Sequence, residues 1–153
     1  MRALLILCLS LFAFSSHGQL YLKTKSKTYL NKTARIIKIT HKDLAKVREK
    51  EQRGIFAKSV KHQRQAKAFY EKGDFKNALY HSNYARDLVF NVYMFNNPDF
   101  PKNFEYSDNE RALMAGRPSD ETLQETLVRL NPGITFEDEP YEQDEQLYDL
   151  EVN

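Results

Sequence analysis

The sequence predicts an all-α protein built on an antiparallel helical hairpin. Gly73 can close a helix in the left-handed conformation, and the carboxylate of Asp74 can cap the helix that follows. Apolar and small residues after Asp74 recur at spacings of three and four, which places them on one helical face. A fainter stripe precedes Gly73. The stripe after the turn comprises Phe75, Ala78, Leu79, Ser82, Ala85, Leu88, Val89, Val92 and Phe95.

Residues 1–18 have the composition of a secretory signal. Arg2 precedes an apolar run of about a dozen residues, and small residues end the segment. We expect cleavage before Gln19 and a secreted or periplasmic protein. The alternative is an uncleaved anchor, although the run is short for a membrane span. Cleavage removes Cys8, which is the only cysteine, so the mature chain has no disulfide.

The two halves of the mature chain carry opposite charges. Residues 19–67 contain fifteen Lys and Arg against three acids, whereas residues 68–153 contain seven Lys and Arg against eighteen acids. Within the basic half, residues 19–39 show no helical period and are rich in β-branched residues and lysines. We expect a basic extended arm there, in which Ile36, Ile37 and Ile39 form a short strand or pack under the helices.

Residues 40–133 are predicted to form the helical domain. Thr40 and Asp43 resemble a helix start, and one long helix is expected from His41 to Lys72. After the hairpin, Pro98 and Pro101 fall in a loop, whose aromatic residues we expect to pin it to the hairpin. Two shorter helices should then cover the hairpin. Their expected caps are Ser107 or Asp108 for the first, with Gly116 closing it, and Ser119 or Asp120 for the second.

The hairpin resembles one tetratricopeptide repeat over about residues 62–95. The resemblance implies a helix–turn–helix unit that serves protein binding. His62 stands where the pattern has a large aromatic residue, and Phe90 where it has its last proline. No second copy follows, although arrays normally have about three repeats. The matching positions are Ala66, Phe69, Gly73, Asp74, Phe75, Ala78 and Ala85.

Two sets of side chains are candidates for binding. Tyr80, Tyr84 and Tyr93 lie on an aromatic-rich helix, and tyrosine is suited to protein contacts because it buries a ring while keeping its hydroxyl hydrogen-bonded. Basic residues before the hairpin are the candidates for an anionic surface. These are Lys23, Lys25, Lys27, Lys46, Arg48, Lys50 and Arg53.

Residues 134–153 form an acidic tail with eight acids, no base and several interspersed apolar residues. Such tails are commonly disordered, which is our expectation here. Alternating acids and apolar residues also suit a recognition segment, and the tail could fold back on the basic half of the chain.

The sequence lacks several motifs that are typical of catalysis. There is no glycine-rich phosphate loop or nucleophile elbow, and His62 and His81 alone are too few for a metal site. We therefore expect a non-catalytic binding or scaffolding module of the cell envelope, with no cofactor, no metal and no small-molecule substrate. Its partner is another envelope or secreted protein. The alternative is a protein that binds a polyanion or a membrane surface through its basic half.

Overall fold

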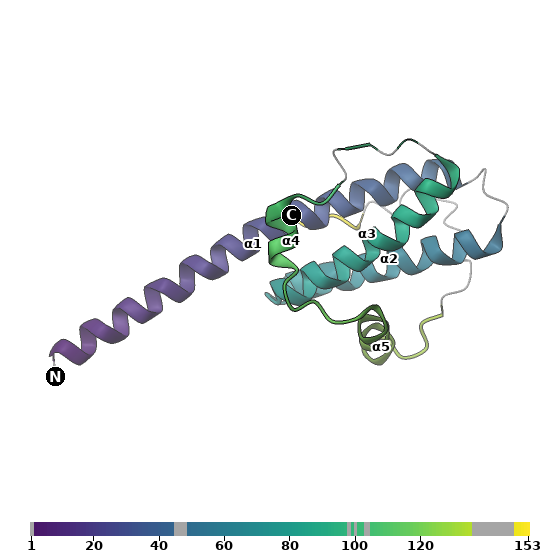
Figure 1. The fold of residues 1–153 in the computed structure, drawn as a ribbon. Helices are drawn as coiled ribbons and strands as arrows, with labels where there is room; N and C mark the ends of the chain where they lie inside the picture. Colours follow the sequence, from purple (N-terminus) through teal and green to yellow (C-terminus); the bar gives the residue numbers. More distant parts are fainter. Residues whose placement is uncertain (1, 45–48, 98, 100, 103–104, 136–148) are drawn as a thin grey trace.

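Helices are the regular structure throughout the described part of the chain. The computed structural model describes residues 2–44, 49–97, 99, 101–102, 105–135 and 149–153. Figure 1 shows three long helices packed together, with the N-terminal part of the first projecting from the bundle. The helices are α1 (Arg2–Leu44), α2 (Lys50–Glu71), α3 (Phe75–Asn96), α4 (Asp108–Leu113) and α5 (Asp120–Leu130).

The predicted hairpin is formed by α2 and α3. Gly73 has φ +80° and its amide donates to the Tyr70 carbonyl at 3.0 Å, which closes α2. The Asp74 side chain accepts from the Asn77 amide and so caps α3. The turn thus has three residues between the helices, which are Lys72, Gly73 and Asp74. Ala66, Ala78 and Ala85 are all fully buried.

The prediction of an extended arm at residues 19–39 is wrong, because this segment belongs to α1. Its buried positions do follow a helical period, but three of them are the polar residues Ser26, Thr33 and Thr40. Because these inner positions are polar, the apolar residues of the sequence do not show the helical period by themselves. The buried residues of the inner face are Ser26, Tyr29, Leu30, Thr33, Ala34, Ile36, Ile37 and Thr40.

The expected single helix from His41 to Lys72 is also wrong. α1 ends at Leu44, and Glu49 takes extended backbone angles (φ −71°, ψ 113°) before α2 begins at Lys50. Two helices with a break between them can pack side by side, which one continuous helix cannot do. The break therefore brings α1 back against both helices of the hairpin.

The core is shared mainly among α1, α2 and α3. One cluster joins Ile36 and Ile37 of α1 to Phe56 and Val60 of α2 and to residues of α3. We expected the short helices after the hairpin to be its cover, but α1 covers more of it than α5 does. α5 contributes the buried Leu123 and Leu127. The predicted caps Ser107 and Ser119 are confirmed, since each side chain accepts an amide in the first turn of its helix.

The end of the acidic tail is packed into the core. Leu150 is fully buried among residues of α1, α2 and α3, and Val152 is 4% exposed beside Leu30 and Tyr70. The prediction of a disordered tail is therefore wrong for residues 149–153. The rest of the predicted tail lies mostly at residues 136–148, outside the described residues.

Candidate functional site

The C-terminal segment, residues 149–153, lies on a surface formed by α1 and α2, which we call the C-terminal docking site. Asn31 on α1 makes the most specific contact: its side-chain Nδ2 donates to the Val152 carbonyl at 3.0 Å, and its Oδ1 accepts from the Val152 amide at 2.8 Å. Both backbone groups of Val152 are thus satisfied by a single side chain. The site comprises Leu30, Asn31, Lys38, Gln63 and Lys67.

Gln63 on α2 connects the segment with α1. Its buried Nε2 donates to the Leu30 carbonyl at 2.9 Å and to the Leu150 carbonyl at 3.2 Å. Losing either of these hydrogen bonds would leave a buried polar group without a partner and would cost free energy. The two bonds together therefore fix the orientation of the Gln63 side-chain amide. Gln63 therefore sets the depth at which Leu150 enters the core.

Two lysines engage the acids of the segment. Lys38 of α1 pairs with Glu151 at 2.7 Å, and Lys67 of α2 donates to both the carboxylate and the carbonyl of Asp149. The hydrogen bond and charge of Lys67 lower the pKa of Asp149 below its usual value. Asp149 is 83% exposed at its side chain, so this pair is weak and serves mainly to select charge.

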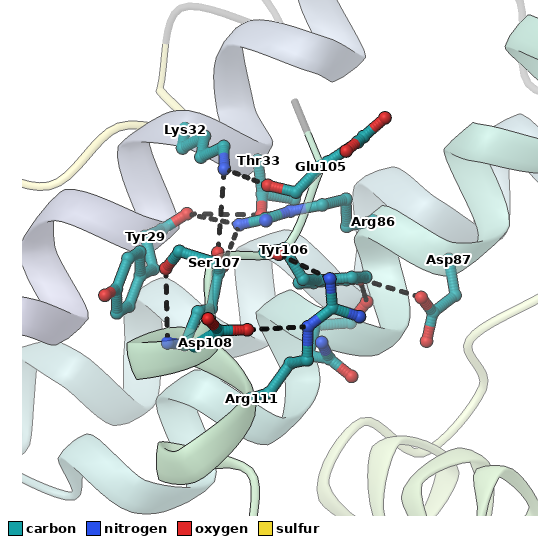
Figure 2. A network of polar contacts seen from close by, with 12 residues as sticks. Tyr29, Lys32, Thr33, Arg86, Asp87, Glu105, Tyr106, Ser107, Asp108 and Arg111 are labelled. Atoms are coloured by element: carbon teal, nitrogen blue, oxygen red, sulfur yellow. Dashed lines mark hydrogen bonds and ion pairs between the residues drawn. The ribbon is translucent and has the colours of Figure 1, made fainter. Parts of the chain in front are cut away.

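A buried ionic network holds α1 in place against α3 and α4 (Figure 2). Arg86 of α3, 1% exposed, pairs with Glu110 of α4 at 2.6 Å and donates to the Thr33 hydroxyl at 3.0 Å. It also donates to the Tyr29 carbonyl at 3.2 Å. Because Tyr29 and Thr33 flank Leu30 and Asn31 in α1, the network orients the face of α1 that contacts the C-terminal segment.

Tyr106 extends this network toward α5 (Figure 2). Its ring lies 4.7 Å from the Arg86 guanidinium, and its hydroxyl donates to Asp87 at 2.7 Å. Burial raises the pKa of Asp87, opposed by the Tyr106 hydrogen bond and by Arg117. Arg117 reaches Asp87 at 3.5 Å and Asp120 at 2.6 Å. The predicted pinning of the loop to the hairpin is thus confirmed for Tyr106, while Phe100 and Phe104 lie outside the described residues.

His62 and His81 face each other in the hairpin, as their positions suggested. Their Nδ1 atoms lie 3.0 Å apart, and the Nε2 of His62 lies 3.1 Å from the Gln124 side-chain oxygen of α5. Burial is the main cause that lowers the pKa of His62 to about 3 and that of His81 to about 4, and the positive charge of Arg117 contributes to both shifts. Both rings are therefore neutral at pH 7, with one proton shared across the Nδ1 contact. Throughout the described ranges, no three metal-binding side chains gather into one site.

The outer surface of α1 carries a line of cations. Lys27, Lys32, Arg35 and Lys38, which we call the basic face of α1, line a concavity of about 740 Å³. Two of them already have carboxylate partners, since Lys32 lies 3.6 Å from Glu110 and Lys38 pairs with Glu151. The concavity also includes Asn31, so the basic face and the C-terminal docking site are adjacent.

The residues that were predicted to bind a polyanion lie in different environments in the structure. Lys23 and Lys27 are exposed on α1, and Lys25 is half-buried over the Tyr21 ring. Arg53 is half-buried on α2. Lys46, Arg48 and the side chain of Lys50 lie outside what is described. The α1 residues that join Lys27 in the concavity were not in the predicted set, because an extended arm assigns no common face to positions 27, 32, 35 and 38.

The predicted tyrosine contacts do not form an outer surface. Tyr80 is 4% exposed and Tyr84 is 7% exposed, in a cluster with Leu123 of α5. The Tyr80 hydroxyl donates to the Ala115 carbonyl at 3.1 Å, which satisfies it internally. Only Tyr93 is partly exposed. Other parts of the chain therefore cover these two aromatic residues of α3 internally.

Asn31 and Gln63 are the site residues that sequence reading missed as binding groups. Asn31 begins the triplet Asn31-Lys32-Thr33, which fits an N-glycosylation sequon. In the fold, Asn31 is engaged by Val152 and Thr33 is buried beside Arg86. The folded chain therefore does not offer this triplet for glycosylation.

Comparison with protein-family models, with curated proteins and with solved structures produced no match to this chain. A search of the described helices for one both long and apolar enough to cross a membrane also found none.

Proposed function

We propose that this protein is a non-catalytic, secreted or periplasmic module of the cell envelope that binds another protein. The observation that carries the proposal is the C-terminal docking site. There the helical bundle holds a peptide segment through backbone hydrogen bonds from Asn31 and Gln63, together with two buried apolar side chains. Recognition through backbone groups and apolar sockets is a general mode of protein binding by a rigid scaffold.

The packing of α1 is consistent with export. Residues 18–21 of α1 are exposed, and the described side chains begin to pack at Leu22 and Ser26. Cleavage before Gln19 would therefore leave the packed part of α1 intact. Mass spectrometry of the protein recovered from its source cells tests this step, since a chain that still begins at Met1 would exclude cleavage.

The binding proposal is tested by affinity capture of the tagged mature chain in envelope extract, with washes at low and high salt. We expect a defined protein to remain at high salt, in a smaller amount than at low salt, because salt screens contacts with lysine and arginine side chains but screens apolar and backbone contacts little. An Asn31→Ala variant should lose that protein, whereas Lys42→Ala, on the exposed surface of the same helix, should retain it. Loss of all bound protein at high salt would refute the proposal.

A second candidate function is the binding of a polyanion or an anionic membrane surface. The basic face of α1 favours it, because four cations line one concavity on a single helix. Neutralising each phosphate or sulfate releases counterions, so binding should weaken steeply between about 50 and 200 mM salt. Heparin and vesicles of anionic lipid are suitable probes. A Lys27→Ala/Arg35→Ala variant that keeps the wild-type salt dependence would exclude this face as the binding surface.

A further inference from the structure

The C-terminal docking site recognises features that other peptides share. Val152 is held through its amide and carbonyl, and Leu150 and Asp149 through their carbonyls, so four of the described hydrogen bonds are made to backbone groups. Backbone groups are present in every peptide. The site therefore does not require the chain's own C-terminus as its ligand, only a segment with suitable side chains.

The side chains that suit the site alternate along the segment. Leu150 and Val152 are buried, whereas Asp149 and Glu151 face Lys67 and Lys38 at the rim. Buried apolar positions supply affinity, and the rim lysines disfavour a peptide with basic residues at the same positions. The preferred sequence is thus acid–apolar–acid–apolar.

The neighbouring basic face extends this preference. Asn31 and Lys38 belong both to the docking site and to the concavity on α1, and the concavity continues to Lys27 and Arg35. An acidic protein segment that enters the docking site and continues along α1 would meet additional cations.

We propose that the C-terminal docking site binds an acidic, apolar peptide segment of another protein, and that the chain's own C-terminus is an intramolecular competitor for this site. The inference rests on the proposed function and specifies its partner and its regulation. A tethered segment has an effective concentration on the order of millimolar. A partner therefore needs contacts beyond those of residues 149–153, which the basic face of α1 supplies.

The test uses a fluorescein-labelled peptide of residues 146–153 and the full chain, with binding measured by fluorescence polarisation. Two tail variants release the site by different means: Leu150→Ser/Val152→Ser removes the apolar anchors, and Asp149→Lys/Glu151→Lys reverses the rim charges. Both should bind the peptide about tenfold or more tightly than the wild type, because the docking site is free of the chain's own segment in a larger fraction of the molecules. Adding Asn31→Ala to either should reverse the gain, and adding Lys42→Ala should not.

The charge-reversed variant leaves the core residues unchanged. It therefore still tests the inference if the Leu150→Ser/Val152→Ser variant folds poorly. In the apolar variant, peptide should also raise the melting temperature, since a ligand that binds only the folded state stabilises it. The inference is overturned when a folded tail variant binds the peptide no more tightly than the wild type, or when Asn31→Ala has no effect. Salt-resistant capture of a protein by the wild-type chain would then still support the proposed function, at a different surface.

Discussion

Acidification is predicted to destabilise the fold through the buried pair of His62 and His81. The folded-state pKa values are about 3 and about 4, both below the ordinary value of 6.5. The unfolded chain therefore binds more protons than the folded chain between pH 6.5 and 4, and stability falls as the pH falls through that window. Well above pH 6.5, from about pH 7.5, both histidines are almost entirely neutral in both states and contribute little pH dependence.

The magnitude follows from the two shifts. One pKa unit corresponds to about 1.4 kcal/mol, and each histidine should contribute a loss of about 2 kcal/mol between pH 7 and pH 5. Together they remove about 4 kcal/mol of stability. The free energy of unfolding of a domain is roughly 5–15 kcal/mol, so this loss is a large part of it. Below pH 4 the loss should level off, first at His81 and then at His62, because the folded state begins to take up protons.

The assay is urea unfolding followed by far-UV circular dichroism at several pH values between 5 and 7.5. The difference between wild type and His62→Gln/His81→Gln isolates the pair from the carboxylates, which titrate in both proteins. The wild type should lose about 4 kcal/mol more than the double variant from pH 7 to pH 5. Equal losses in wild type and double variant would refute the reasoning, as would an NMR titration midpoint near 6.5 for either ring in the folded protein.

Three further predictions concern stability, each measured by chemical denaturation. Glu110→Ala should destabilise the fold by about 3–5 kcal/mol, because it leaves the buried Arg86 without its carboxylate; adding Arg86→Met should recover much of that loss, and no recovery would contradict an electrostatic cause. Leu150→Ala should cost about 2–5 kcal/mol, since it opens a cavity among the residues of three helices; a cost below about 0.5 kcal/mol would mean that the C-terminal segment is not docked in solution. Gly73→Ala should cost about 1–2 kcal/mol because φ is +80°; an unchanged stability would contradict the left-handed turn.

The hairpin and the helix caps could be predicted from the sequence because local chemistry determines them. The turn depends on the freedom of Gly73 to adopt positive φ and on the reach of the Asp74 carboxylate, both of which are properties of neighbouring residues. The same holds for Ser107 and Ser119 at the starts of α4 and α5. The kinship of the hairpin to tetratricopeptide repeats stays a prediction.

The helical state of residues 19–39 could not be predicted by the same reasoning. β-Branched residues there favour extended structure locally, and tertiary packing overrides that preference. Ser26 and Thr33 can occupy the inner face of α1 because the fold supplies partners: Ser26 donates to the Leu22 and Phe75 carbonyls, and Thr33 accepts from Arg86. A polar residue with a remote partner is indistinguishable in sequence from a polar residue in water.

By itself, the sequence determined the all-helical class, the position of the turn, the caps of the short helices and the opposite charges of the two halves. Tertiary structure alone decided that α1 completes the bundle, that Tyr80 and Tyr84 are internal, and that Asn31 and Gln63 hold the C-terminal segment. The reason is the distance along the sequence between the residues that make each contact. The first set depends on contacts within one or two helical turns, whereas Asn31 and Val152 meet across most of the chain, where no local periodicity records the pairing.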